Sequence, residues 1–231
     1  MAKIKILSLN VHIWVRDLNP HKWEQFCLPR TIKMLRLFRR EKPDIIGLQE
    51  RIQPLGKVLL GLFSYKVFSS RESRIPVYVR KSVAKAYDMK LRKQNLGTAK
   101  DNGHGVTIVT MWHEGNPIYI QNCHYSLTDV EFMNELQYGF LPNTIFFGDL
   151  NRTKEKFASK FHKHRTSDQI VFADKTPTGQ PTYMSYGEPV KMSDIDHIGY
   201  VAYSGFAPKI TCKVLPDRLS DHYPILAEVE L

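Results

Sequence analysis

The nine residues IFFGDLNRT, at positions 145–153, decide how the rest of this chain is interpreted. Three apolar residues and a glycine are typical of a short buried strand, and Asp149, Asn151 and Arg152 follow directly. Side chains two apart along a strand point to the same side, so we expect Asp149 and Asn151 to face one ligand. A carboxylate offers charge for a hard cation or for activating water, a carboxamide offers a donor and an acceptor, and Gly148 allows close approach.

Two β-rich runs near the N-terminus also end at polar residues. KIKILSLN (3–10) alternates with period two and ends at Asn10, and DIIGLQE (44–50) is predicted to be a buried strand ending at Glu50. The alternation assigns one face of the first run to Ile4, Ile6, Ser8 and Asn10, and the other face to Leu7 and Leu9.

The same arrangement continues in the second half of the chain. PIYIQNC (117–123) leads into His124, and DIDHIGYVAY has Asp196 at the start of its apolar run. We choose Asp196 over Asp194, which could be a turn residue. Asp221 and His222 stand before the last strand, and histidine is the side chain most easily tuned for proton transfer near neutral pH.

The remaining periodic segments indicate the fold class. TIKMLRLFRR (31–40) is predicted to be helical, between a turn at Asn19-Pro20 and Pro43, with one face made of Ile32, Leu35 and Phe38. VYVRKSV (77–83) and GVTIVTMW (105–112) are further predicted strands. Strands interleaved with few helices, without repeats or linkers, predict a single domain over residues 1–231 with an α/β sandwich fold.

Several of these polar residues have a purely structural interpretation when taken alone. Glu50 could be the solvated end of a strand, and Asn10 could be a turn former. His124 could be an ordinary, partly buried histidine. These residues form a site only if the fold brings them together.

Two basic segments are not predicted to form a metal or catalytic site. His162 and His164 resemble a metal-ligand spacing, but Phe157 and Phe161 at helical spacing favour a solvated helix face over a small apolar patch. The run KAYDMKLRKQ (85–94) is predicted to be exposed surface or loop, where it could contact phosphates through charge alone.

Composition limits the class of partner. The chain has 231 residues, 42% of them hydrophobic, which suffices for one sizeable core. Thirty-three Lys and Arg against 23 Asp and Glu give a net charge of +10, which attracts polyanions such as nucleic acid or an anionic membrane surface. The same charge could simply keep the protein soluble.

The cysteines and the N-terminus indicate the compartment. Cys27, Cys123 and Cys212 lack CxxC spacing and are too few for a disulfide framework. MAKIKILSLN has no apolar segment long enough for a secretory signal, and no window approaches a membrane span. We therefore expect an intracellular protein, cytoplasmic or nuclear. Its oligomeric state is not determined by the sequence, and a monomer is assumed.

Taken in order, the strand ends read LN, LQE, NCH, GDLN, IDHI and SDH. This ordered set resembles the endonuclease/exonuclease/phosphatase superfamily, which includes pancreatic-type deoxyribonucleases, apurinic endonucleases, deadenylases, neutral sphingomyelinases and inositol polyphosphate 5-phosphatases. The resemblance extends from Asn10 to His222. It implies a four-layered α/β sandwich with two packed mixed, mainly antiparallel β-sheets flanked by helices. It also implies Mg²⁺-dependent phosphoester hydrolysis, in which Mn²⁺ can substitute.

The resemblance further implies metal and water roles for matching residues. Glu50 resembles the principal metal ligand, with Asn10 in the same metal and phosphate network and Asp221 beside the metal. Asp149 resembles the residue that orients or deprotonates the attacking water, and Asn151 resembles a holder of that water or of a phosphate oxygen. Such a carboxylate-poor site suits Mg²⁺, which keeps several waters.

Other matching residues are implied to contact the phosphate. His124 resembles a donor to it, and Asp196 would hold and polarise His222, which would bind a phosphate oxygen or transfer a proton. An Asp behind a His fixes its tautomer and stabilises its protonated form. Donors aimed at the non-bridging oxygens lower the barrier. Arg152, beside this group, is expected to bind substrate.

No single branch of the superfamily matches throughout. Position 12 is His, where several branches place an acidic, amide or aromatic residue, and its role is open. GDLN runs into Arg152 and Thr153, whereas 5-phosphatases carry a tyrosine and an arginine there. The net charge makes a nuclease the leading hypothesis. A phosphodiesterase or phosphatase acting on phospholipid or inositol phosphate headgroups is the alternative, and a non-catalytic binding module is the third.

Overall fold

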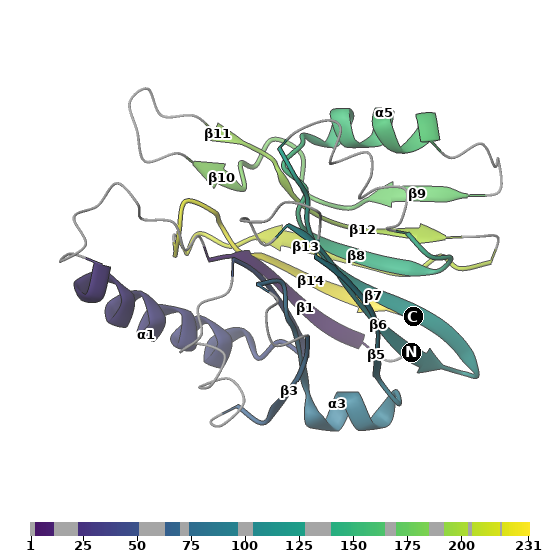
Figure 1. Cartoon of the computed structure of the whole chain (residues 1–231), viewed down its shortest axis with the longest axis horizontal. Coiled ribbons are helices and arrows are strands. Elements are labelled where there is room, and N and C mark those ends of the chain that lie inside the picture. The colour runs from purple at the N-terminus through teal and green to yellow at the C-terminus, as the bar shows by residue number, and fades with distance from the viewer. Residues whose placement is uncertain are drawn as a thin grey trace.

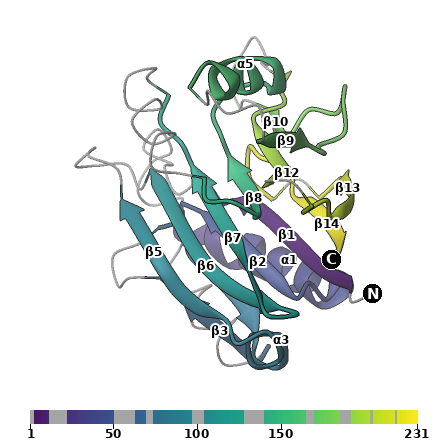
Figure 2. The ribbon, with the colours of Figure 1, turned by 90° about the vertical axis from the view of Figure 1, so that its right-hand side faces the viewer.

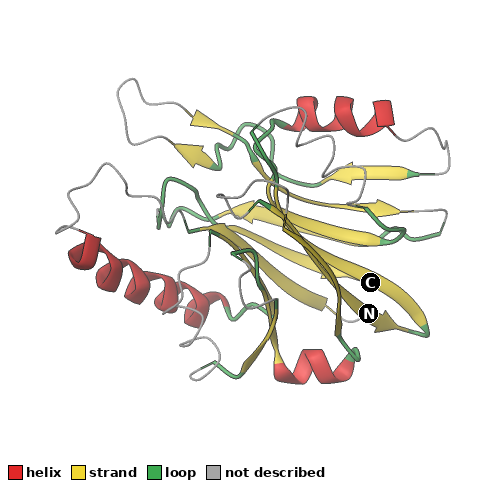
Figure 3. Ribbon diagram, in the orientation of Figure 1, coloured by secondary structure: helices red, strands yellow, loops and turns green. Residues whose placement is uncertain are grey.

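Two six-stranded β-sheets pack face to face and carry helices on their outer sides (Figure 1; Figure 3). The computed structural model describes residues 3–11, 23–50, 63–69, 74–96, 104–127, 140–164, 170–184, 192–202, 205–217 and 219–231. The predicted turn at Asn19-Pro20 and the residue His12 lie outside these ranges. None of the described helices is long and apolar enough to cross a membrane.

The first sheet contains both ends of the described chain. Its strand order is β13 (Lys209–Val214), β14 (Ile225–Glu230), β1 (Lys3–Asn10), β2 (Ile45–Gln49), β4 (Val77–Arg80) and β3 (Tyr65–Phe68). Among these described strands β1 and β2 run parallel, and the other neighbours are antiparallel.

The second sheet repeats this plan. Its order is β5 (Lys90–Leu96), β6 (Gly105–His113), β7 (Asn116–His124), β8 (Thr144–Asp149), β12 (Asp196–Ala202) and β9 (Val171–Asp174) (Figure 2). Here β7 and β8 are the parallel pair among the described strands. A separate two-stranded sheet joins β10 (Tyr183–Met184) to β11 (Met192–Ser193).

One apolar cluster lies between the two sheets, and a further apolar cluster lies between each sheet and the helix on its outer face. Strand β1 shows the division predicted from its alternation, because Ile4 and Ile6 join the cluster between the sheets while Leu7 and Leu9 join the cluster under helix α1 (Trp23–Glu41). Helix α5 (Lys154–His164) covers the outer face of the second sheet (Figure 1). The order helix, sheet, sheet, helix confirms the predicted four-layered sandwich.

Several local predictions need correction. The buried face of α1 is formed by Met34, Leu37 and Phe38, whereas Ile32 is 40% exposed. The predicted strand 77–83 ends at Arg80, and helix α3 (Lys81–Ala86) follows. The run 85–94 is not a loop, because it contains the end of α3 and the start of β5, but its described side chains are mostly exposed as predicted, with Met89 buried. These ends depend on tertiary pairing, which overrides local propensity.

Candidate active site

The parallel pairs place four polar residues at one edge of the sandwich. In the first sheet Asn10 pairs with Gln49, immediately before Glu50. In the second sheet His124 pairs with Asp149, and Asp149 also lies opposite Asp196 across β8 and β12. The carboxyl ends of parallel strands lie at the same edge of a sheet, so residues up to 139 positions apart become neighbours.

Asn10 joins the two sheets at this edge. Its Nδ2 donates to Glu50 Oε1 over 3.1 Å and to Asp149 Oδ2 over 3.0 Å. His124 Nε2 lies 3.8 Å from each of the same two carboxylates. All four side chains are buried, so the solvated end suggested for Glu50 and the turn suggested for Asn10 are both wrong.

Asp149 is held in a buried, negatively charged environment. Burial raises the pKa of Asp149, the neighbouring Asp196 carboxylate raises it further, and His222 opposes them, so that it reaches about 7. The preceding Gly148 has φ 134°, and a Cβ there would lie 2.0 Å from the Cys123 carbonyl oxygen. Glycine is therefore required for β8 to lie this close to β7.

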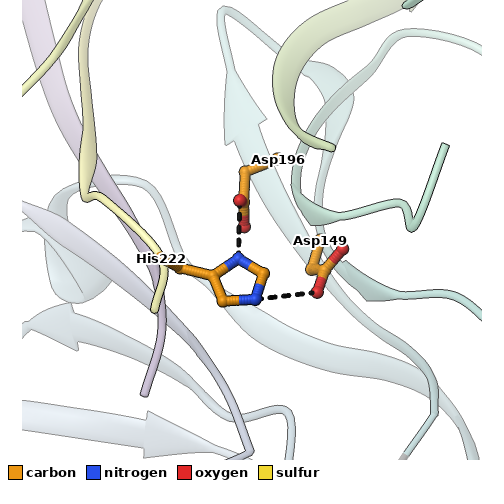
Figure 4. Close-up of side chains that lie close together, drawn as sticks. All are labelled: Asp149, Asp196 and His222. Carbon is orange, nitrogen blue, oxygen red and sulfur yellow. Dashed lines mark hydrogen bonds and ion pairs between the residues drawn. The ribbon is translucent and has the colours of Figure 1, made fainter. Parts of the chain in front are cut away.

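His222 forms a hydrogen-bonded dyad with Asp196 (Figure 4). Its Nδ1 lies 2.7 Å from Asp196 Oδ2, and its Nε2 lies 3.7 Å from Asp149 Oδ2. Burial alone lowers the pKa of His222, but the carboxylates of Asp196 and Asp149 outweigh burial and raise it to about 10. The imidazole is therefore protonated at neutral pH and presents a cationic donor to the centre of the site.

The turn that leads into β14 fixes this imidazole in place. Ser220 Oγ donates to the Asn10 carbonyl over 2.7 Å and accepts from the His222 backbone N–H over 2.9 Å. Asp221 lies at the edge of the group, with Oδ1 4.0 Å from His222 Nε2. On the other side, Thr182 Oγ1 accepts from the Asp196 backbone N–H over 2.9 Å.

Asn151 reaches the site through a turn and not through strand alternation. Strand β8 ends at Asp149, and Asn151 has φ 51°, a left-handed conformation that asparagine tolerates better than most residues. Its backbone N–H donates to Asp149 Oδ1 over 2.8 Å, and its Nδ2 donates to the Tyr125 carbonyl over 2.7 Å. Glu50 likewise follows β2 and has φ 55°. The prediction that Glu50 is the last residue of the strand is therefore wrong.

Arg152 lies beside the group and does not join its centre. The guanidinium donates from Nη1 to the Asn151 carbonyl and from Nη2 to the Leu127 carbonyl, both over 2.7 Å. Helix α5 begins two residues later, and its buried face contains Phe157 and Phe161 as predicted. The side chains of His162 and His164 lie outside the described part of the structure.

A second buried His–Asp pair, which the sequence interpretation missed, supports this turn from behind. His197 lies 2.7 Å from Asp174 Oδ2 through Nδ1 and 2.7 Å from the Arg152 carbonyl through Nε2. Because both partners accept hydrogen bonds, both ring nitrogens carry protons. Burial lowers the pKa of His197, but Asp174 and the Arg152 carbonyl outweigh it and raise the pKa. The DH dipeptide at 196–197 was the available signal.

Two further residues near the site carried no local signal. Tyr183, on β10, packs edge-on against His222 with ring centroids 5.0 Å apart. Burial, Asp221 and Asp149 raise the pKa of Tyr183. Beneath the site, Gln49 Nε2 donates to Asn122 Oδ1 over 2.5 Å and links the two sheets. Only the pairing of distant strands reveals either contact.

The donor set fits a hard divalent cation. Glu50 and Asp149 bring two buried carboxylates to one amide and one imidazole, and a cation would offset their charge. Asp149, Asp196 and His222 also offer ligand atoms within 4.8 Å of one another. Because Asp196 and His222 are already hydrogen-bonded together, the oxygen-rich side towards Glu50 is the better match for Mg²⁺ or Mn²⁺.

Comparison with protein families agrees with this geometry. The model of the Endonuclease/Exonuclease/phosphatase family matches residues 23–222. The chain belongs to this family. Its members are phosphoesterase hydrolases that depend on divalent metals. A search of curated proteins finds no match.

Solved structures share the fold at low sequence identity. TDP2 of D. rerio, complexed with a single-strand DNA product, is 17% identical with a TM-score of 0.67, and the match covers 100% of both chains. SmcL is 17% identical with a TM-score of 0.68, covering 99% of both chains. The endonuclease domain of TRAS1, a telomere-specific non-LTR retrotransposon, is 12% identical with a TM-score of 0.62, covering 99% of both chains. At these identities the likeness establishes the fold alone.

Proposed function

We propose that this protein is a divalent-metal-dependent phosphodiesterase that acts on nucleic acid. The proposal rests on three buried side chains that lie close together. Asp149 is an acid with a pKa of about 7, His222 is a protonated donor, and Glu50 is a second carboxylate. A base works best when its pKa lies near the working pH. When the environment gives two neighbouring titratable groups very different pKa values, one is suited to act as the acid and the other as the base.

In the proposed reaction, Asp149 accepts a proton from a water molecule while the water oxygen forms a bond to phosphorus. The P–O bond to the leaving group breaks, and the leaving oxygen takes a proton from solvent water, which yields a phosphomonoester and an alcohol; Asp149 then returns its proton to solvent. His222, held by Asp196, and His124 donate hydrogen bonds to the non-bridging oxygens, where negative charge accumulates. Asn151 positions the water or a phosphate oxygen, and Arg152 contacts the substrate beside it.

A divalent ion would be held by Glu50 with Asn10, with Asp149 and Asp221 at its side. When bound, such an ion supplies charge neutralisation for the phosphate and polarises the water. Two protein carboxylates and water are a usual environment for Mg²⁺. The choice of nucleic acid as substrate is supported by the net charge of +10.

The test is a substrate panel with Mg²⁺, Mn²⁺ and EDTA. It contains plasmid, single-stranded DNA, RNA, sphingomyelin vesicles, phosphatidylinositol 4,5-bisphosphate vesicles and bis(p-nitrophenyl) phosphate. Wild type is compared with Asp149→Ala and His222→Ala, with Asp194→Ala as the matched control outside the site. We expect metal-dependent cleavage of nucleic acid that both site variants lose by a hundredfold or more.

The outcomes separate the alternatives. Product from a phospholipid or inositol phosphate headgroup, without product from nucleic acid, would establish the lipid alternative. No product from any ester with either metal would leave a non-catalytic binding module. Equal turnover by wild type and both site variants would mean that the activity came from a contaminant.

A further inference from the structure

A groove begins at the candidate active site and continues along the exposed side of helix α5. It has a volume of about 800 Å³, and its lining includes Asn151 of the site and Ile195, which precedes Asp196. This volume lies within the range of about 300–1,000 Å³ that ligand pockets occupy. A group attached to a phosphate at the site would therefore enter this groove.

Cationic side chains line the groove at regular spacing. Arg152, Lys156 and Lys160 recur every four residues, and among the described residues that line the groove Glu155 is the one acid. Lys156 and Lys160, four residues apart on α5, lie on one face of the helix, whereas Phe157 and Phe161 are buried against the sheet. These two lysines are separated by about 6 Å at the helical rise, and Arg152 precedes the helix, so the positive charge continues from the site onto α5.

The cation nearest the site is fixed in direction. The Arg152 guanidinium donates to two backbone carbonyls, on Asn151 and Leu127, over 2.7 Å. The Arg152 carbonyl is in turn held by His197 over 2.7 Å. These contacts place its charge at the junction between site and groove without the entropy that a free arginine loses on binding.

We propose that this groove binds the phosphates that follow the scissile one along a nucleic-acid strand. This inference rests on the proposed phosphodiesterase function and narrows its substrate class. Three successive cations, one at the junction with the site and two on the first turns of α5, suit repeated phosphates better than a compact headgroup. The quaternary ammonium of a phosphocholine headgroup would be repelled by the same groove.

The experiment compares two charge-matched double variants. Lys156→Gln with Lys160→Gln removes two cations from the groove, whereas Lys81→Gln with Lys85→Gln removes two from helix α3. That helix follows strand β4 at the end of the sheet away from Glu50. Both variants therefore change the net charge equally, and they differ in where it changes.

The first readout is the ratio of kcat/KM for octathymidylate to kcat/KM for thymidylyl-thymidine, which has one phosphodiester. We expect the groove variant to lower this ratio at least tenfold, mainly through KM, and the α3 variant to keep it within twofold of wild type. An equal loss in both variants, or a loss in neither, would overturn the proposal. A larger loss on phosphatidylinositol 4,5-bisphosphate vesicles than on octathymidylate would assign the groove to a lipid headgroup instead.

The second readout does not require activity and separates failure of this inference from failure of the proposed function. Binding of fluorescent octathymidylate is measured by anisotropy in EDTA at several salt concentrations. Each lost phosphate contact lowers the slope of log K against log salt by about 0.7 for a single strand. The groove variant should lower the slope by about 1.4. An unchanged slope would overturn the groove assignment, whether or not wild type cleaves any ester.

Discussion

Replacement of Asp196 by Asn tests the central dyad of the candidate active site. The two side chains are nearly the same size, so the change removes one negative charge 2.7 Å from His222 Nδ1 without opening a cavity. The charge centres lie about 4 Å apart, and at an effective dielectric constant of about 20 their attraction is about 4 kcal/mol. That energy corresponds to about a thousandfold in rate.

We expect kcat of Asp196→Asn to fall about a thousandfold while KM changes by less than about threefold. The pH profile provides a second check. Asp196 raises the pKa of His222, so its removal lowers that pKa. If the protonated imidazole assists the reaction, the alkaline limb of the kcat profile moves to lower pH in the variant.

The assay is steady-state hydrolysis of the best substrate from the panel between pH 5 and 10, with Mg²⁺ present. Thermal unfolding shows whether the variant keeps its fold; the Asp196 contact with Thr182 uses the backbone N–H and is retained. Asp194→Asn is the matched control and should behave as wild type. A kcat within fivefold of wild type and an unmoved alkaline limb would refute the assigned role of the dyad.

Three further outcomes follow from the contacts described above. Excess EDTA should abolish hydrolysis. Mg²⁺ at about a hundred times its Kd should stabilise the fold by about 2.7 kcal/mol, which thermal unfolding measures as an increase in Tm. The absence of this increase, or an equal increase in Glu50→Gln, would contradict the assignment of Glu50 as a metal ligand. Gly47→Ala should cost about 1–3 kcal/mol in urea unfolding, because its Cβ would lie 2.1 Å from Phe147 Cε2, and adding Phe147→Leu should recover part of that loss. His197→Ala should cost about 3–5 kcal/mol because it leaves Asp174 buried without its partner. The folded pKa of His197 is raised from 6.5 and that of Asp174 is lowered from 3.8. The difference in stability should therefore be largest between pH 3.8 and pH 6.5, and it should shrink as pH falls through the folded pKa of Asp174 or rises through the folded pKa of His197. A difference independent of pH would contradict the ion pair.

Local patterns predicted individual strands well where one face is buried. The alternation of Ile4 and Ile6 with Leu7 and Leu9 assigned both faces of β1 correctly, because a strand's side-chain period is fixed at two. The same reasoning was wrong for Asn151, because the strand had already ended and a left-handed turn sets its direction. The alternation of side chains between two faces applies only within a strand and ends with its last paired residue.

Residues whose role depends on distant partners could not be found locally. Tyr183 lies on the short strand β10 and Thr182 directly precedes it, and they meet the site through a bridge to His222 and a hydrogen bond from the Asp196 backbone N–H. Asp174 becomes important only because β9 pairs with β12 and brings it to His197. No window of the sequence contains both members of these contacts.

Local sequence patterns were enough to identify the available chemical groups and the strand ends at which they stand, because periodicity and turn residues act over a few positions. That these ends meet follows from the way distant strands pair and pack. The parallel pairs β1–β2 and β7–β8 bring Asn10, Glu50, His124 and Asp149 to one edge, and the packing of the two sheets joins those pairs into one site. Such pairing depends on the register between distant strands and on burial of both sheet faces, and neither is encoded within a single segment.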